Sequence, residues 1–495
     1  MRAGLLYSSE NFVWQKKPDF TKKERFSDLE LEYILEAMSR ENGDNEKGED
    51  NAEIYNVCGQ VLDSPLQNKE EITYRQDILK DCISKPSVFR EIYRICQEAE
   101  EKRKRCWNSL TSPHITTVYS SAADLLKIYM GALVGIRRIL EKQNFSSEGM
   151  RNFSDLLCSE LSDEYLDELK SLEYEISEND SDLMSAGFGA FLQGVSYTKC
   201  QRSRGLASLH WLMLPSYTIA DKDMKGAKDL EIRRERALND AADSMAKAAE
   251  NLEGFVNQLR RETAFYVGAV NLYERLTQIN LPVCFPSFSG EEKRIWCNLC
   301  DASLGLMTEK SVVGNDLETD GEIFYLITGA NQGGKTTFLR SVGQCQLMAQ
   351  CGLFVCADKC ELPVKKCIFT HFKREEDSSM KSGRLSEELE RMSRIVVVLK
   401  PGGMLLSNES FSSTNDFEGS EILGQITDAL LERNIEVFAV THLINYSMSY
   451  SRNEHALCLI AERKETGERT FRMIPGKPMK TAYGEDIFKR VFSEK

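Results

Sequence analysis

The stretch IFYLITGANQGGKTTFLR, residues 323–340, decides the fold of the carboxy-terminal part of this sequence. It begins with an apolar run of strand length, passes through GANQGGKT at residues 329–336, and ends in residues with a helical pattern. The middle part fits G-x-x-x-x-G-K-[ST], in which glycines let backbone N–H groups turn inward around phosphate oxygens. We therefore predict a phosphate-binding loop between a strand and the start of a helix.

The residues of this loop are expected to hold ATP together with Mg²⁺. Lys335 is predicted to neutralise the β- and γ-phosphates, and the Thr336 hydroxyl is predicted to bind the metal ion. The other predicted nucleotide-binding residues of the loop are Gly329, Asn331, Gly333, Gly334 and Thr337. The alternative is a glycine-rich turn without a ligand, which the complete motif in its strand-to-helix context disfavours.

Short apolar strands alternate with helical segments beyond about residue 286. The strands are predicted at residues 323–328, 353–357, 367–372, 404–407 and 436–441. This alternation is typical of a parallel sheet with crossover helices, whose strands end at one common edge. We predict an α/β nucleotidase domain over residues 286–495.

Two of these strands bring further polar side chains to the edge of the phosphate loop. One strand leads to Asn408 and Glu409, and another leads to His442. In nucleotidases of this architecture an Asp at the first position holds the Mg²⁺ shell, whereas Asn408 can hydrogen-bond a metal-bound water but brings no charge. We predict Glu409 and His442 as catalytic residues with Lys335, and Asn408 as a Mg²⁺ ligand through water. The alternatives are a buried strand with a polar end and a structural histidine.

The segment SGRLSEEL, residues 382–389, predicts the start of a helix, where free backbone N–H groups favour an anion. We predict that Ser386 binds nucleotide there, with a plain Ser-capped helix as an open alternative. The order of phosphate loop, Ser segment, Asn-Glu strand end and His is that of ABC-type ATPases. In those proteins two subunits hold two ATP molecules between the loop of one and the Ser segment of the other.

Helical patterns dominate the chain before residue 286. Residues 1–114 predict short helices, interrupted by an acidic loop at residues 43–51. From Leu238 to Tyr273 apolar residues recur every seven positions, which predicts a long helix packed lengthwise on a partner. About 40 helical residues at 1.5 Å each reach roughly 60 Å. The pattern favours a lever within residues 115–285, and a long helix in an ordinary bundle is the open alternative.

Charge restricts where a nucleic acid could bind. The formal net charge of −14 argues against a general attraction to polyanions. Residues 196–236 differ, because they hold nine basic and five acidic side chains. We predict a small clamp-like insertion at about residues 184–232 whose candidate DNA contacts are Lys199, Arg202, Arg204, Lys222, Lys225 and Lys228. A solvated surface of mixed charge is the alternative.

The sequence has no apolar run long enough to span a membrane, and its first residues do not resemble a signal peptide. We expect a cytoplasmic protein without membrane contact. The 15 cysteines then favour free buried thiols. Cys297 and Cys300 form a close pair without a second pair at zinc-site spacing, so structural cysteines are expected.

These motifs resemble those of the MutS-family DNA mismatch-repair ATPases. TGANQGGKTTFLR is similar to the family's TGPNMGGKST, and SGRLSEELERM resembles SGRSTFMVEM. NESFSSTNDFEG is similar to DEIGRGTSTFDG without a gap, and THL corresponds to THY. The resemblance implies an all-α core and long helical lever with a small clamp, followed by an ABC-type P-loop ATPase domain. It also implies a homodimer formed through the ATPase domains.

Departures from the family pattern refine the expected function. Asn408 stands where the family has Asp, and the core-like region begins near residue 28, without a counterpart of the mismatch-reading domain. We expect an ATPase-coupled clamp on DNA, in mismatch repair or recombination, that does not read mispairs directly and hydrolyses ATP weakly. The alternative is a poorly hydrolysing, ATP-dependent assembly or switch factor that acts on a ribosome or a repair complex.

Overall fold

The computed structural model describes residues 2–8, 21–41, 51–106, 110, 114–164, 184–188, 194–199, 224–290, 293–330, 332–374, 383–453, 456–464 and 469–478. The chain divides into two compact units. Unit 1 consists of Met1–Leu5 and Ser87–Thr263, and unit 2 of Leu6–Pro86 and Ala264–Lys495. The domain limits expected at residues 114 and 285 stay predictions.

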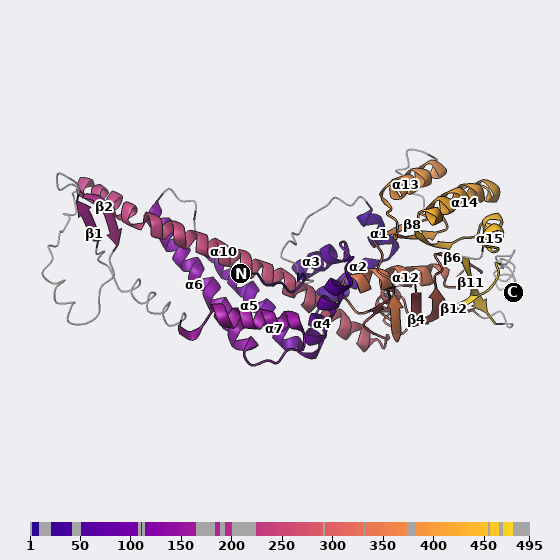
Figure 1. Cartoon of the computed structure of the whole chain (residues 1–495), viewed down its shortest axis with the longest axis horizontal. Coiled ribbons are helices and arrows are strands. Elements are labelled where there is room, and N and C mark those ends of the chain that lie inside the picture. Colours follow the sequence, from indigo (N-terminus) through magenta and orange to yellow (C-terminus); the bar gives the residue numbers. More distant parts are fainter. Residues whose placement is uncertain are drawn as a thin grey trace, which may run out of the picture. The chain divides into compact units, whose positions relative to one another are not determined.

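Unit 1 is mainly helical (Figure 1). Its helices are α5 (Pro86–Arg105), α6 (Ile115–Leu140), α7 (Glu148–Glu160) and most of α10 (Met224–Gln278). Strands β1 (Met184–Phe188) and β2 (Gly194–Lys199) form an antiparallel pair. The strands expected after residue 184 are therefore present, whereas much of the second acidic helix predicted up to residue 177 lies outside the described residues.

Helices α5 and α6 form an antiparallel hairpin. The ring centroids of Phe89 and Phe145 are 6.3 Å apart, and a methyl group added at Gly135 would lie 3.6 Å from Cδ1 of Ile95. Residues early in α5 thus lie beside residues late in or after α6, so the two helices run in opposite directions. The apolar face of α6 that the sequence predicted is buried in this arrangement, at Leu125, Tyr129, Leu133 and Ile136 among others.

Helix α10 runs in the same direction as α6 within unit 1. Nδ1 of His114, the N-cap of α6, lies 3.6 Å from Oε1 of Glu235, which is about three turns into α10. Farther along, burial and the nearby carboxylate of Glu253 raise the pKa of the Tyr129 phenol. The 55 residues of α10 confirm the long helix expected from the seven-residue repeat, and repeat positions such as Leu238 and Leu259 are buried.

The amino-terminal part of unit 2 consists of short helices, as the sequence predicted. These are α1 (Lys22–Asp28), α2 (Leu31–Ser39), α3 (Ala52–Leu62) and α4 (Lys69–Ser84). Asn51 and Asn68 cap α3 and α4, where their side chains accept backbone N–H groups of the first turn. The acidic loop predicted at residues 43–51 lies almost wholly outside the described residues.

A six-stranded sheet with the order β12-β11-β6-β10-β9-β8 forms the centre of unit 2. Five strands are parallel: β6 (Phe324–Thr328), β8 (Ile368–Phe372), β9 (Met404–Asn408), β10 (Glu436–Val440) and β11 (Ala456–Arg463). The edge strand β12 (Arg469–Pro475) runs antiparallel to β11. Every residue of β6, β8, β9 and β10 is buried, as in parallel strands covered on both faces.

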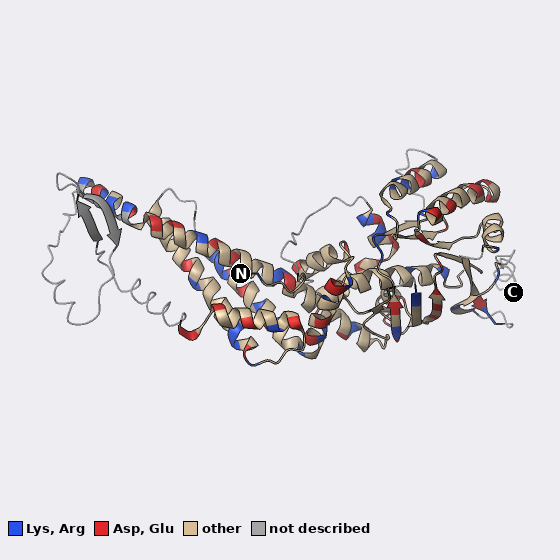
Figure 2. Ribbon diagram, in the orientation of Figure 1, with Lys and Arg blue, Asp and Glu red and all other residues tan. Residues whose placement is uncertain are grey.

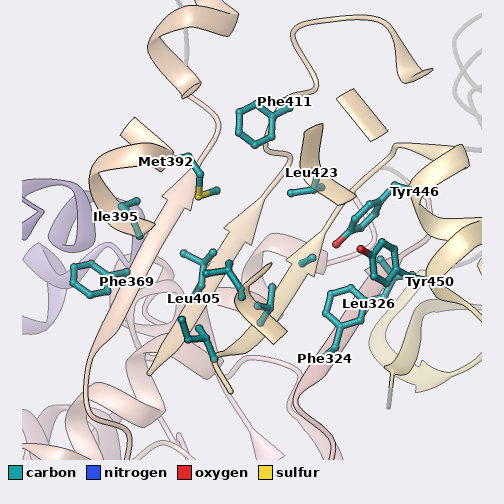
Figure 3. Packing of buried hydrophobic residues seen from close by; sticks show 14 of the residues in the cluster. Phe324, Leu326, Phe369, Met392, Ile395, Leu405, Phe411, Leu423, Tyr446 and Tyr450 are labelled. Atoms are coloured by element: carbon teal, nitrogen blue, oxygen red, sulfur yellow. The ribbon is translucent and has the colours of Figure 1, made fainter. Parts of the chain in front are cut away.

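Helices α12 (Lys335–Gln350), α13 (Arg384–Val398), α14 (Asp416–Glu432) and α15 (Ile444–Tyr450) lie beside this sheet (Figure 1). The apolar faces of α13, α14 and α15 meet the strands in one core (Figure 3). Met392 and Ile395 of α13 and Tyr446 of α15 contribute to it together with Leu405 of β9. Each such side chain stabilises the fold by about 1.5–3 kcal/mol on burial, so the core fixes the strands firmly.

A smaller sheet has the order β3-β7-β4-β5. Its strands are β3 (Ser287–Phe288), β4 (Lys293–Leu299), β5 (Asn315–Asp320) and β7 (Lys359–Leu362), with α11 (Ala302–Thr308) after β4. The prediction of a strand at residues 353–357 is wrong. Gly352, with φ of +77°, ends the turn after α12, and the buried segment that follows makes a single bridge between Val355 and Cys284. Apolar composition predicted its burial but not its pairing.

The cysteines that the structure describes are all free thiols, and Cys300 is buried while Cys297 is partly exposed. No group of three or more His, Cys, Asp or Glu side chains within the described ranges could hold a metal ion. None of the helices in that same part of the chain is long and apolar enough to cross a membrane.

Candidate active site

The loop between β6 and α12 has a backbone that requires glycine. Gly329 has φ of +122°, and a Cβ atom added there would lie 2.9 Å from the backbone nitrogen of Ala461. A Cβ atom at Gly333 would lie 2.8 Å from the Ala461 side chain. Gly334, with φ of +89°, is the N-cap of α12. The loop is thus wrapped closely over β11, with the free N–H groups of α12 at its end.

Lys335 folds back into this loop. Its Nζ donates hydrogen bonds to the carbonyl oxygens of Gly329 and Ala330, each at 3.0 Å, and the residue is only 5% exposed. Burial lowers the pKa of Lys335 to about 8, with the charge of Arg469 acting in the same direction and Glu409 opposing it. A buried ammonium group is poorly hydrated, so a polyanionic ligand stabilises its charged form.

Thr336 and Asn408 meet at the end of the parallel strands. The Thr336 hydroxyl donates to Oδ1 of Asn408 across 3.2 Å. Asn408 is the last residue of β9, and Val440 and Phe372 are its partners in the neighbouring strands. The register therefore aligns the ends of three strands, which is why side chains far apart in the sequence converge here.

Glu409 and His442 form a pair at the same edge. Oε1 of Glu409 lies 3.0 Å from Nε2 of His442. The Glu409 side chain is 30% exposed and the His442 side chain is 28% exposed. The hydrogen bond from His442 holds the pKa of the Glu409 carboxyl below its usual range, against the opposing effect of burial. Glu409 has φ of +53°, a left-handed conformation uncommon outside glycine, and its N–H donates to the Val440 carbonyl at 2.8 Å.

A cavity of about 560 Å³ opens beside the loop. Its phosphate-loop side is lined by Gln332, Gly333, Gly334, Lys335, Thr336 and Thr337, and Glu409 also reaches it. Its lining also includes the apolar side chains of Phe471 and Val313, which are 48% and 44% exposed, and Phe471 lies beside Gly334 of the loop. The cavity thus combines N–H donors with apolar side chains, which suits a ligand with a charged and a planar part.

Several predicted residues lie apart from this cluster. Ser386 is exposed in the first turn of α13 and lines neither this cavity nor its neighbour. Asn331 lies outside the described residues, as do Arg202, Arg204 and Lys222. Lys199 ends β2, with its side chain outside the description, and Lys225 and Lys228 are exposed on the first turns of α10.

Four further residues of this region were not among those predicted from the sequence. Arg469 of β12 donates to Oε1 of Gln332 at 2.9 Å, and Phe471 reaches the loop from the same strand. No local motif marks these two, because their position depends on how β12 pairs. Lys373 and Arg374 directly follow β8, so the rule that predicted Asn408 could have found them.

Comparison with known protein families gives two matches along the chain. Residues 67–279 match the MutS2 N-terminal domain, and residues 325–490 match MutS domain V. The DNA mismatch repair protein MutS of Thermotoga neapolitana is 33% identical over 181 residues. The chain belongs to the MutS family.

Two further relatives of this MutS-family chain are similar over limited regions. MutS protein homolog 4 of Homo sapiens is 30% identical over 139 residues, which are 28% of this chain and 15% of the relative. The DNA mismatch repair protein MutS of Thermus thermophilus is 28% identical over 236 residues, or 46% of this chain and 28% of the relative. The Thermotoga match covers 36% and 22%, so the matched region is less than a third of these relatives' length.

Proposed function

We propose that this MutS-family chain binds ATP in the cavity beside the phosphate loop. The observation that carries the proposal is the convergence of Lys335, Thr336, Asn408, Glu409 and His442 at the ends of β6, β9 and β10. Lys335 exchanges its two loop carbonyls for phosphate oxygens, and the N–H groups at the start of α12 bind the same anion. The base lies against the apolar side chains of Phe471 and Val313.

The donor chemistry beside the loop fits Mg²⁺. The hydroxyl of Thr336 and the amide oxygen of Asn408 are hard oxygen ligands 3.2 Å apart, and the Glu409 carboxylate follows directly in the chain. Thr336 would hold the ion, and Asn408 would hold it through water. When bound, Mg²⁺ neutralises charge on the phosphate oxygens.

We infer that Glu409 and His442 support hydrolysis of ATP. The carboxylate of Glu409 is ionised at neutral pH as an ordinary glutamate is, and the hydrogen bond from His442 lowers its pKa further. It can therefore accept a hydrogen bond from a water that attacks the γ-phosphate, while His442 fixes the carboxylate's orientation. The neutral amide of Asn408 supplies no charge beside the metal, so turnover is expected to be slow.

Two copies of the chain are proposed to close around ATP through the α/β parts of unit 2. The exposure of Ser386 supports this arrangement, because a residue that faces solvent in one copy is available to the nucleotide of another. The helix start at Ser386 offers N–H groups to an anion. In such an isologous pair each ATP touches both copies.

DNA is the proposed target of unit 1. Lys225 and Lys228 stand exposed at the beginning of α10, where blue and red residues alternate in Figure 2. The candidate contacts Lys199, Arg202, Arg204 and Lys222 precede them in the chain. A clamp of this kind grips the phosphate backbone, so its affinity falls with salt, and it reports shape more than sequence. We propose a role in mismatch repair or recombination.

Steady-state ATP hydrolysis tests the proposal. Phosphate production with Mg²⁺ is expected from the parent protein, and a loss of 100-fold or more is expected for Glu409→Gln and Lys335→Ala. Lys400→Gln, which removes an exposed charge at the amino end of β9, is the control and should hydrolyse ATP like the parent. Equal rates in the parent and Glu409→Gln would contradict the assigned site.

A second candidate function is an ATP-binding switch that hydrolyses poorly and serves in assembly. Asn408 favours it, because a neutral amide stands at the end of β9 where a carboxylate would hold the Mg²⁺ shell. Asn408→Asp separates the two functions. An ATPase gains rate when the charge beside Mg²⁺ is restored, whereas a silent switch binds ATP with no hydrolysis in either form.

A further inference from the structure

A second cavity, of about 610 Å³, adjoins the candidate active site on the side of β8 and α13. It shares Thr336 and Glu409 with the first cavity and also touches Asn408. We name it the Arg391 cavity. Its charged lining consists of the cations Lys373, Arg374, Arg384 and Arg391 and the carboxylates Glu387, Glu388 and Glu409.

Arg391 is the least satisfied of these cations. Its side chain is 6% exposed, and its Nη1 donates to the Phe372 carbonyl at 3.2 Å. Nε and Nη2 are buried but donate no hydrogen bond. Burial lowers the pKa of Arg391, and the neighbouring charge of Arg374 acts in the same direction. Buried N–H groups without acceptors are costly, so this guanidinium favours an anionic ligand.

The carboxylates of Glu24, Asp28 and Glu388 lie near Arg391, and two of them also have other partners. One oxygen of Glu24 in α1 lies 2.8 Å from Nη2 of Arg374 and 3.5 Å from Nε of Arg391, so two guanidiniums share it. Glu388 accepts the N–H of Phe411 at 2.8 Å.

Glu409, the carboxylate beside the strand ends, is paired with His442. The amino group of Lys373 is exposed at the mouth of the cavity. Nε and Nη2 of Arg391 nevertheless donate no hydrogen bond within the described residues.

We propose that the Arg391 cavity binds a phosphate-class oxyanion, namely the inorganic phosphate cleaved from ATP. This inference rests on the proposed function for the source of the anion. Arg391 and Lys373 donate to its oxygens, and such charge-assisted bonds are the strong ones.

The position of the cavity identifies the product as its occupant. In hydrolysis water adds its oxygen to the γ-phosphorus, the bond to the bridging oxygen breaks, and ADP keeps that oxygen. The phosphate retains one hydrogen of the water, and the other leaves as a proton to solvent. The attacking and leaving oxygens lie in line, so the phosphorus moves toward the water and hence toward Glu409. Glu409 lines both the first cavity and the Arg391 cavity, so it is the wall that the two share.

Calorimetric titration of inorganic phosphate into the full chain without nucleotide tests this site directly. We expect saturable binding that Lys373→Gln and Arg391→Gln each weaken about tenfold, the equivalent of 1.4 kcal/mol. Lys400→Gln removes the same charge at the other end of the sheet and should bind like the parent. If Arg391→Gln does not fold, the weaker phosphate binding of Lys373→Gln alone still tests the site.

The same titration on Lys335→Ala separates the two anion sites, because Lys335 lines the first cavity and not the second. Binding that survives in Lys335→Ala supports the Arg391 cavity. Binding that is lost in Lys335→Ala and kept in Lys373→Gln would place the anion in the phosphate loop and overturn the proposal.

Two further results separate this proposal from the ATPase proposal. An active ATPase with no saturable phosphate binding would overturn the Arg391 cavity alone. Phosphate binding at Arg391 in a protein that never hydrolyses ATP would overturn the product as the source. Displacement of phosphate by duplex DNA would show a nucleic-acid phosphate as the occupant and likewise contradict the inference.

Discussion

Charged side chains have different roles in the two units. In unit 2, Arg294 of β4 and Glu436 of β10 are 0% and 1% exposed, and Nε of Arg294 donates to Oε1 of Glu436 at 2.8 Å. Lys365 lies 3.4 Å from the other carboxylate oxygen. In unit 1, the pair of Lys247 and Asp243 on α10 is 70% and 62% exposed. Buried charges thus join the two sheets that surround the site, whereas the helices of unit 1 are held together by their apolar faces.

This difference predicts where substitutions are tolerated. A buried ion pair leaves an uncompensated charge when one partner is removed, and an exposed pair loses little because water replaces it. Unit 2 therefore keeps the strand ends in register, as a site that must align several side chains requires. The exposed faces of α10 can vary in charge without loss of the fold.

The largest effect is expected from Glu436→Gln. The substitution leaves Arg294 and Lys365 buried without their carboxylate, and we expect the free energy of unfolding to fall by about 3–5 kcal/mol. Chemical denaturation of the full chain measures this loss. Asp243→Asn in α10 is the matched control and should leave the melting temperature unchanged. Equal effects of the two variants would contradict the comparison.

A pair of glycines sharpens the comparison further. A methyl group at Gly343 of α12 would lie 2.5 Å from side-chain atoms of Leu29 and Leu406, whereas nothing lies within 4 Å of one at Gly254 of α10. Gly343→Ala is therefore expected to destabilise the protein by about 1–3 kcal/mol through overpacking. Gly254→Ala should stabilise it by about 0.5–1 kcal/mol, because alanine loses less backbone entropy in a helix. Thermal melts of both variants check the opposite signs.

The smallest of the three effects concerns Lys335. Its pKa of about 8 in the folded chain lies below the ordinary 10.5, so the unfolded chain binds more protons between these values. The stability of the parent therefore rises with pH from about 8 to 10.5. Lys335→Met removes the buried charge and should raise stability near pH 7 by about 1–2 kcal/mol, after the loss of two hydrogen bonds.

Melts of Lys335→Met and the parent at pH 7 and pH 10 test this prediction. The advantage of the variant is expected to shrink at the higher pH, while binding of a fluorescent ATP analogue is lost at both. An advantage that grows with pH would show that the charge of Lys335 stabilises the ligand-free fold.

The site was predictable where chemistry is local in sequence. The phosphate loop places Lys335 and Thr336 by itself, and the parallel-sheet rule places Asn408, Glu409 and His442 at one edge. The seven-residue repeat likewise predicted α10, because periodicity reports burial directly. For this part of the site, the structure therefore supplies mainly the distances between side chains and the directions of their pKa shifts, because the residues themselves were predicted from the sequence.

The rest depended on pairing and packing over long sequence distances. Phe471 and Arg469 reach the loop because β12 pairs with β11, which no local pattern encodes. No local sequence pattern marked Arg391 as a binding residue. Two of its nitrogens lack hydrogen-bond acceptors because of the way α1 and α13 pack, and this packing joins segments far apart in the sequence. The segment at residues 353–357 was mistaken for a strand because buried loops and strands have the same apolar composition.

Mixing two inactive variants tests the central claim, that ATP is hydrolysed in sites built from the phosphate loop of one copy and the Ser segment of another. Lys335→Ala disables the loop and Ser386→Arg blocks the exposed helix start, so each protein alone should be inactive. An equal mixture should recover about a quarter of the parent ATPase rate, because half of the dimers combine the variants and each has one intact site. A mixture as inactive as its components would contradict the account.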